Sequence, residues 1–495
     1  MVAIQKFNVK RVAVIGAGPA GLAAAKYLLA EKAFEKIDVI EQQSTPTGIW
    51  KYSPENGDGL EKVPQTDPHT PVEKPRWRSA EDEAVGKGNK REATFVTPLY
   101  ERLETNIPKT IMRFSDLAFP EEAQLFPKHD TVAGYLEEYS KDVRHLIKFQ
   151  TQVLDVRPSR APEGQETWLV KTLDLQAGEE KEEVYDAVVV ANGHYSVPYI
   201  PDIQGLAEWN KRYPGVVSHS KSFRTPDAFK DKKVIVVGNS ASGLDIGSQI
   251  STVSKLPLIS SERSASYLSP GPQQNKEEYP EIVEFILDQR SVRFANGHIE
   301  KDIDAIVFCT GYLYSLPFIP ALEPPPVSDG THIQHVYKHI FYIYHPTLAF
   351  VALPQKVIPF PTSEAQAAVV ARVWSGRLAL PSQSTMGAWE DSVVDERGAG
   401  REYHTLMFPL DADNINDLRE WSEQAERRKG LDNNGLGKLP PFWDEKERWT
   451  RERFPAIKKA FMEKGEARHD IRTMEELGFD FEAWKRENES ASSLL

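Results

Sequence analysis

The sequence predicts an α/β fold with two nested dinucleotide-binding (Rossmann-like) domains, and two stretches of the chain carry that prediction. At residues 12–21 a short apolar run, typical of a buried parallel strand, leads into a glycine-rich turn and then into a stretch rich in alanine and leucine. The same order of apolar run, glycine-rich turn and helix-like stretch recurs from residue 234. Such a unit presents backbone N–H groups and a helix N-terminus to a pyrophosphate. The 495 residues leave room for both units.

Composition and charge exclude several classes of function. The chain is 40% hydrophobic and 27% charged, which is ordinary for a soluble globular protein, and its net charge of −13 argues against a general nucleic-acid binder. No apolar run approaches the roughly 18 residues of a membrane span, and the first strand starts too early for a signal peptide. The single cysteine, Cys309, excludes an internal disulfide, a redox-active cysteine pair and a cysteine zinc site. We therefore expect a cytoplasmic protein with no membrane anchor, no bound metal and no nucleic-acid partner.

The first glycine-rich turn, residues 16–21, has the spacing G-x-G-x-x-G, and each glycine has a physical reason. The first permits the tight turn off the strand, the second lets the backbone approach a pyrophosphate, and the third lets the helix pack closely on the strand. A carboxylate stands 20 residues past the last glycine, where it can bind ribose hydroxyls. We expect a dinucleotide to contact Gly16, Gly18, Pro19, Ala20, Gly21 and Glu41.

The second turn, residues 238–243, reads G-x-S-x-x-G, with serine as a small replacement for the middle glycine. Counting 20 residues past its last glycine reaches an arginine with two serines beside it. An arginine at the ribose position suits a 2′-phosphate, whereas an acid suits a free 2′-hydroxyl. The residues expected at this second nucleotide are Gly238, Asn239, Ser240, Ala241, Ser242, Gly243, Ser260, Ser261 and Arg263.

An internal repeat indicates how the two units are connected. Residues 186–194 and 304–312 share the order of an aspartate, an apolar run and a glycine turn, and each is followed by a proline-rich exit. The second unit is therefore nested between parts of the first. We expect a discontinuous FAD-binding domain at 1–196 and 322–495, with an NADPH-binding domain inserted at 197–321.

Two dinucleotide sites in one chain suggest a hydride relay. A tightly held FAD would take electrons from a nicotinamide nucleotide that binds and leaves. A disulfide-reductase mechanism needs a pair of cysteines, which one cysteine cannot supply. Dioxygen is the simplest remaining electron acceptor.

At this point the chain resembles a known family, the flavin-containing monooxygenases. Residues 213–223, YPGVVSHSKSF, fit the pattern F-x-G-x-x-x-H-x-x-x-[FYW] that identifies the family, with Tyr213 for the first aromatic residue, and they lie just before the second glycine turn. Further matching segments occur along nearly the whole chain, at 16–21, 48–50, 105–109, 238–243 and 310–312.

The resemblance implies FAD, NADPH, dioxygen and a C4a-hydroperoxyflavin that oxygenates a soft nitrogen or sulfur of a small-molecule substrate. It also implies that Asn106 contacts the reactive region of the flavin; from the residues alone, a turn or helix cap is the simpler interpretation of that asparagine. Further cofactor contacts carried over from the family segments are Gly48, Trp50, Thr105, Thr310, Gly311 and Gln366.

Two departures from the family pattern bear on the choice of activity. Thr47 stands where the family often has glycine, and the apolar C-terminal anchor of mammalian members is missing, so the chain is more similar to soluble microbial or fungal members. Baeyer–Villiger monooxygenases share the identifying pattern but expect Trp-Pro at its end, where this chain has Phe223-Arg224. That activity, an uncoupled NADPH oxidase and a nucleotide-binding regulatory protein remain alternatives. The physiological substrate, nitrogen versus sulfur oxygenation and the oligomeric state, with a homodimer among the options, stay open.

Overall fold

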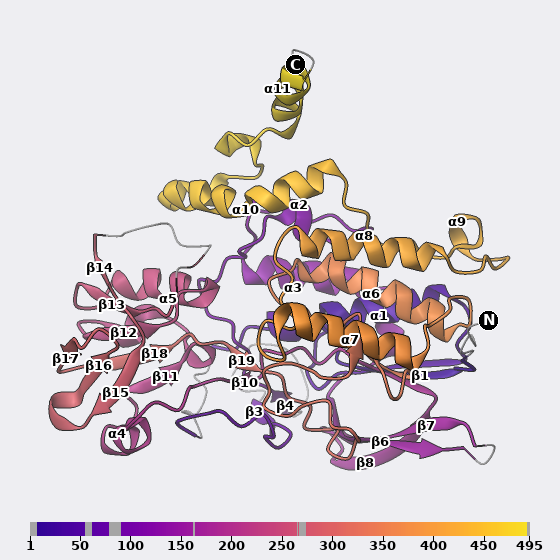
Figure 1. Cartoon of the computed structure of the whole chain (residues 1–495), viewed down its shortest axis with the longest axis horizontal. Helices are drawn as coiled ribbons and strands as arrows, with labels where there is room; N and C mark the ends of the chain where they lie inside the picture. The colour runs from indigo at the N-terminus through magenta and orange to yellow at the C-terminus, as the bar shows by residue number, and fades with distance from the viewer. Residues whose placement is uncertain are drawn as a thin grey trace.

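The computed structural model describes residues 7–54, 62–78, 91–161, 164–264, 266 and 274–492, with side chains as far as residue 489. In Figure 1 a larger unit on the right and a smaller unit on the left meet at the short strands β10 and β19, and the C-terminal helices α10 and α11 lie above them. Each unit is built on its own parallel sheet.

The larger unit contains a seven-stranded sheet with β1 near its middle. β1 pairs in parallel with β2 on one side and with β9 on the other. The chain leaves this sheet after β9 and returns to it about 150 residues later. The return is seen in β22, which pairs in parallel with β9. The strand order is β20 (Val336–Tyr337), β21 (Phe341–Tyr342), β22 (Leu348–Phe350), β9 (Ala187–Val190), β1 (Arg11–Ile15), β2 (Lys36–Ile40) and β5 (Ile147–Lys148).

Both faces of this sheet are covered, which explains the continuous apolar run in β1. Val12 and Val14 face the helical side, whereas Ala13 and Ile15 face the three-stranded β6–β8 sheet. The covering elements are the helices α1 (Pro19–Ala30), α6 (Pro359–Trp374), α3 (His129–Tyr139), α7 (Gln383–Arg397) and α8 (Leu410–Glu423), and the strands β6 (Thr151–Arg160), β7 (Glu166–Asp174) and β8 (Glu179–Tyr185).

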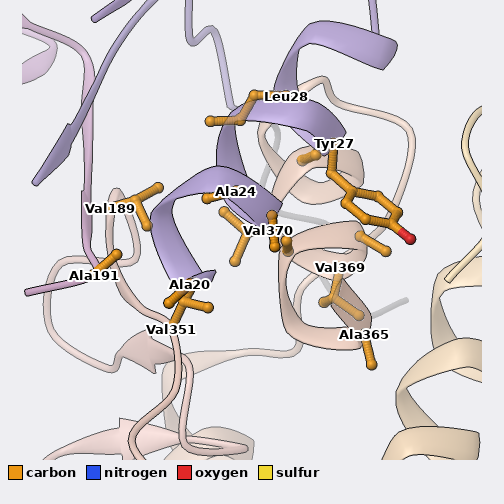
Figure 2. Packing of buried hydrophobic residues seen from close by; sticks show 14 of the residues in the cluster. Ala20, Ala24, Tyr27, Leu28, Val189, Ala191, Val351, Ala365, Val369 and Val370 are labelled. Atoms are coloured by element: carbon orange, nitrogen blue, oxygen red, sulfur yellow. The ribbon is translucent and has the colours of Figure 1, made fainter. Parts of the chain in front are cut away.

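Helices α1 and α6 pack closely because their facing side chains are small. Figure 2 shows Ala24 of α1 beside Val370 of α6, with Ala20 one turn earlier on α1 and the sheet residue Val189 on the other side of α1. All four side chains are buried. This packing fixes the position of α1 and therefore of the glycine turn that precedes it.

The smaller unit has a five-stranded sheet in which every pair is parallel, in the order β11, β18, β12, β13, β14. Its helix α5 follows β12 as α1 follows β1. The elements are α4 (Leu206–Arg212), β11 (Val217–His219), β12 (Val234–Val237), α5 (Ala241–Ser251), β13 (Leu258–Ser261), β14 (Lys276–Tyr279), β15 (Ile282–Ile286), β16 (Ser291–Phe294), β17 (Ile299–Glu300) and β18 (Ala305–Phe308).

The two chain crossings between the units pair with each other. β10 (Val197–Pro198) and β19 (Tyr312–Leu313) form a short antiparallel ladder in which Val197 faces Leu313. In Figure 1 this ladder lies between the two sheets. The ladder therefore joins the two units at the points where the chain passes from one to the other.

The charged C-terminal region folds back onto the larger unit. Trp449 and Phe461 of α10 share a buried cluster with Leu125 and Phe126. Among the described residues, none of the helices combines the length and the apolar composition that crossing a bilayer requires. The remaining elements are β3 (Arg76–Arg78), β4 (Glu92–Thr94), α2 (Lys109–Met112), α9 (Asp432–Gly435), α10 (Glu445–Glu463) and α11 (Phe481–Ser492).

Candidate active site

The first glycine turn lies at the carboxyl end of β1. The N–H of Gly16 donates to the carbonyl of Ile40 at 2.8 Å, and Gly16 has a φ of 98°, which favours glycine. A Cβ on Gly16 would lie 2.6 Å from the carbonyl oxygen of Ala191, and one on Gly21 would lie 1.9 Å from the carbonyl oxygen of Gly16. Both positions therefore exclude any side chain, and the turn can keep this shape only with glycine.

A second segment closes on this turn. Gly48 begins the 3₁₀ turn Gly48–Trp50 with a φ of 54°, and a Cβ on it would lie 2.8 Å from Cα of Gly18. The backbones of the two glycines are thus in contact, beside Pro19 at the first position of α1. Trp50 is partly buried and packs against the core of the larger unit.

Glu41 is buried at the end of β2 and is held by backbone donors. Its carboxylate accepts the N–H of Ala17 at 2.7 Å and that of Gln43 at 2.7 Å. Burial raises the pKa of Glu41, and these backbone donors oppose that rise. Within the described residues, the buried Oε1 of Gln43 has no hydrogen-bond donor. A bare glycine cradle, an anchored carboxylate and an unpaired buried acceptor together fit the pyrophosphate and ribose of a dinucleotide.

The second glycine turn repeats this geometry. Gly238 has a φ of 104°, and its N–H donates to the carbonyl of Ser261 at 2.9 Å. A Cβ on Gly238 would lie 2.7 Å from the carbonyl oxygen of Cys309, and one on Gly243 would lie 1.9 Å from that of Gly238. Ser240 precedes the first residue of α5, and Ala241 and Ser242 form its first turn. The second turn therefore also fits a pyrophosphate.

The hydrogen-bond register shows which residue of the second unit corresponds to Glu41. Gly16 bonds Ile40, the residue before Glu41, and Gly238 bonds Ser261, the residue before Glu262. Counting from the glycines placed Arg263 at this position, one residue too far along. Arg263 itself is exposed just beyond it.

Ser260 and Ser261, the two serines expected to face a 2′-phosphate, are both buried in β13. The hydroxyl of Ser260 donates to Glu262 at 2.7 Å, and that of Ser261 donates to the carbonyl of Pro280 at 3.1 Å. Both hydroxyl protons are therefore used inside the protein.

Asn106 is exposed between two buried residues, Thr105 and Pro108. Its side-chain amide forms no hydrogen bond with the parts of the chain that the structure describes. Pro108, rather than Asn106, precedes the first residue of α2, so the capping interpretation finds no support in the geometry. Thr105 uses its hydroxyl to donate to the carbonyl of Ile107 at 2.9 Å, which holds the turn around Asn106.

Two cations that the sequence analysis did not place at the site bond the chain before Asn106. Lys458 of α10 donates to the carbonyl of Thr105 at 2.8 Å. The guanidinium of Arg224 donates to the carbonyls of Thr97 at 3.3 Å and Leu99 at 3.0 Å. Arg224 directly follows the identifying pattern, which ends at Phe223, and that position was a signal that could have found it. Lys458 had none, because its partner lies 353 residues away along the chain.

The histidine of the identifying pattern bonds the chain next to the β10–β19 ladder, which we call the hinge. His219 is buried, and its Nδ1 accepts the N–H of Lys221 at 3.1 Å. Its Nε2 therefore carries the proton and donates to the carbonyl of Gly311 at 3.0 Å. Burial lowers the pKa of His219 to about 3, so the ring is neutral. Beside it, the hydroxyl of Thr310 donates to the carbonyl of Tyr199.

Gln366 is buried in α6 and is engaged at both ends of its amide. It accepts the N–H of Ala352 at 2.8 Å and donates to the carbonyl of His339 at 3.5 Å. Ala352 follows β22 directly beyond the carboxyl edge of the central sheet. Gln366 therefore joins α6 to the edge of the sheet where ligands of such folds bind.

A fold with two glycine cradles at the carboxyl ends of two parallel sheets defines a protein with two dinucleotide-binding units. Residues 87–281 and 277–405 match the model of the "Flavin-binding monooxygenase-like" family, and residues 14–80 match the "NAD(P)-binding Rossmann-like domain". The chain belongs to the flavin-containing monooxygenase family, and its cofactors are FAD and NADPH. The predicted fold class is confirmed.

Similar proteins occur in plants and fungi. A "Flavin-containing monooxygenase FMO GS-OX-like 4" of Arabidopsis thaliana is 34% identical over 418 residues, which cover 82% of each chain. The "Flavin-containing monooxygenase ustF2" of Aspergillus flavus is 28% identical over 90% of this chain and 98% of its own. The solved S-allyl-L-cysteine S-oxygenase from Allium sativum superposes with a TM-score of 0.74 at 27% identity and covers 98% of this chain and 100% of its own.

Proposed function

We propose that this protein is an NADPH- and dioxygen-dependent monooxygenase that adds one oxygen atom to a soft sulfur or nitrogen of a small molecule. One atom of O₂ goes to the substrate and the other leaves as water, with two electrons from NADPH and one proton. The observation that carries the proposal is Asn106, whose exposed amide has no hydrogen-bond partner among the described residues and which follows a segment bonded by Arg224 and Lys458.

Each part of the site has a role in this reaction. The first cradle and Glu41 would hold FAD, and the second cradle, from Gly238 to Gly243, would hold NADPH. Bound FAD takes electrons from NADPH and activates dioxygen. The amide of Asn106 donates and accepts hydrogen bonds without supplying a proton. Such a group can orient a reactive oxygen species by hydrogen bonds. Because it supplies no proton, it does not promote the loss of that species as hydrogen peroxide.

Sulfur is our first choice of acceptor atom because the garlic neighbour is named an S-oxygenase of S-allyl-L-cysteine. A Baeyer–Villiger activity is the weaker candidate. Its family pattern has proline where this chain has Arg224, and a proline would remove the guanidinium that bonds Thr97 and Leu99. A cytoplasmic location and a homodimer remain predictions.

Product analysis under ¹⁸O₂ tests this function. We would incubate the holoenzyme and NADPH with a thioether, a tertiary amine and a cyclic ketone in turn. We expect a sulfoxide carrying one ¹⁸O atom and about one NADPH consumed per product. A labelled lactone from the ketone alone would instead indicate a Baeyer–Villiger enzyme. Hydrogen peroxide with every substrate would indicate an uncoupled oxidase, and the absence of NADPH turnover would indicate a regulatory nucleotide-binding protein.

A further inference from the structure

Glu262 places a carboxylate where the second unit would meet the adenosine ribose. It follows the last residue of β13, as Glu41 follows the last residue of β2. Its Oε2 accepts the side-chain amide of Asn239 at 2.8 Å, so the carboxylate is fastened to the glycine turn, as Glu41 is through Ala17. A carboxylate at this point is the group that accepts a hydrogen bond from a free 2′-hydroxyl.

Lys276 is the counter-ion of this carboxylate. It rises from β14 beside β13, and its Nζ lies 2.5 Å from Oε1 of Glu262. Only 13% of the Lys276 side chain and 15% of the Glu262 side chain are exposed. Lys276 also contacts the more exposed Glu278, at 3.0 Å. The pair holds the pKa of Glu262 below its ordinary value, so the carboxylate is charged at neutral pH.

The rim of the second cradle thus carries groups for both forms of a nicotinamide nucleotide. Glu262 would repel a 2′-phosphate if it stood alone. Lys276 cancels that repulsion, and the exposed Arg263 supplies a further cation next to it. Neither Ser260 nor Ser261 has a hydroxyl proton to offer, because both donate internally.

On the assignment made above of the second unit to a nicotinamide nucleotide, we propose that Glu262 and Lys276 together select at the ribose 2′ position, so that this site binds NADH as well as NADPH. With NADH, Glu262 accepts the 2′-hydroxyl. With NADPH, Lys276 and Arg263 contact the 2′-phosphate. The balance between the carboxylate and the two cations sets the preference.

Binding of nucleotide fragments tests this selection without any oxygenation step. Calorimetry on the oxidised holoenzyme would compare 2′,5′-ADP, which carries the 2′-phosphate, with 5′-AMP, which carries the hydroxyl. For the wild type we expect the two dissociation constants to differ by no more than about thirtyfold. Glu262→Gln should shift the preference toward 2′,5′-ADP by about tenfold or more, and Lys276→Met should shift it the other way by a similar factor.

Glu277→Gln is the matched control, since it removes an exposed carboxylate of β14 that bonds Tyr279 rather than Lys276. It should leave the ratio of the two constants unchanged. Arg263→Ala, at an exposed position that places no demand on folding, should weaken 2′,5′-ADP and leave 5′-AMP nearly unchanged. The same shifts should appear in the ratio of kcat/KM for NADPH and NADH during anaerobic flavin reduction.

The selection is overturned if Glu262→Gln leaves the binding ratio within about twofold of the wild type. It is also overturned if the wild type binds 2′,5′-ADP more than about a thousandfold tighter than 5′-AMP. Because these measurements need neither dioxygen nor substrate, they stand if no oxygenated product is ever found. A failure of the oxygenase proposal is therefore distinguishable from a failure of this one.

Discussion

At the scale of single residues, the proposed catalytic role of Asn106 can be tested separately from a structural one. Its amide is exposed and unengaged among the described residues, so its removal breaks no internal hydrogen bond. Flavin reduction by NADPH needs only the stacking of two rings, whereas productive use of dioxygen needs a site without stray proton donors. The two half-reactions should therefore respond differently to this side chain.

We expect Asn106→Ser to retain FAD and to be reduced by NADPH at the normal rate, but to release most of its reducing equivalents as hydrogen peroxide. Hydrogen peroxide and sulfoxide formed per NADPH would be measured with a thioether. Thr110→Ala, an exposed change four residues along the chain, is the control and should stay coupled. Normal product yield from Asn106→Ser would mean that the amide has no part in the oxygen reaction.

At the scale of secondary-structure elements, helix α10 supports the segment that carries Asn106. Lys458 bonds the carbonyl of Thr105, and Glu104 and Asp245 are the nearby carboxylates. Burial lowers the pKa of Lys458 to about 8, and those carboxylates oppose the shift. The C-terminal helix thus touches the backbone next to Asn106 directly.

We predict that Lys458→Met raises the fraction of NADPH lost as hydrogen peroxide, by less than Asn106→Ser does, because the amide remains but its backbone is less firmly held. The matched control is the neighbouring exposed Lys459→Met, which should behave as the wild type. If Lys458→Met lost no more NADPH as hydrogen peroxide than the wild type, α10 would not position this segment.

The same variant has a pH signature in stability. From pH 8 to about 10.5 the unfolded chain holds a proton on Lys458 that the folded chain has lost, so the contribution of Lys458 to the free energy of unfolding rises with pH. Chemical denaturation of the wild type and of Lys458→Met across this pH window should show that the free energy of unfolding of the wild type rises relative to that of the variant. A constant difference would contradict the lowered pKa.

At the scale of the whole molecule, the proposed FAD unit and the proposed NADPH unit are joined at the β10–β19 ladder. His219 bonds the carbonyl of Gly311, the residue that directly precedes β19. His219 lies at the end of β11 in the second sheet, so it joins that sheet to the hinge. Loss of this bond should loosen the position of NADPH over the flavin and leave each cradle intact.

We expect His219→Ala to bind FAD normally but to be reduced more slowly at saturating NADPH, by about tenfold, as a misplaced hydride donor would be. Anaerobic stopped-flow absorbance of the flavin measures the rate. Ser218→Ala, one residue earlier on β11, is the control. Since His219 is neutral from about pH 6 to pH 9, the loss should not vary with pH. An unchanged rate would show that the hinge tolerates the missing bond.

Several features of the fold and of the candidate site were determined by short stretches of sequence. The two glycine turns could be predicted because a turn with a φ near 100° and no space for a Cβ leaves glycine as the only option. Glu41 could be predicted from its distance along the chain from the first turn. The continuous apolar run of β1 likewise followed from burial on both faces of a parallel sheet. The family resemblance followed from motifs of the same local kind.

Other features were decided only by tertiary structure, because they depend on how segments far apart in the sequence meet. Lys458 reaches Thr105 across 353 positions, and Arg224 reaches Thr97 across 127. The position in the second unit that corresponds to Glu41 is set by the hydrogen bond between Gly238 and Ser261 at the end of β13. That bond selects Glu262, where a count along the chain selected Arg263. A shift of one residue exchanges a carboxylate for a guanidinium. Spacing in a sequence cannot resolve such a difference, whereas the hydrogen bond between two strands fixes it.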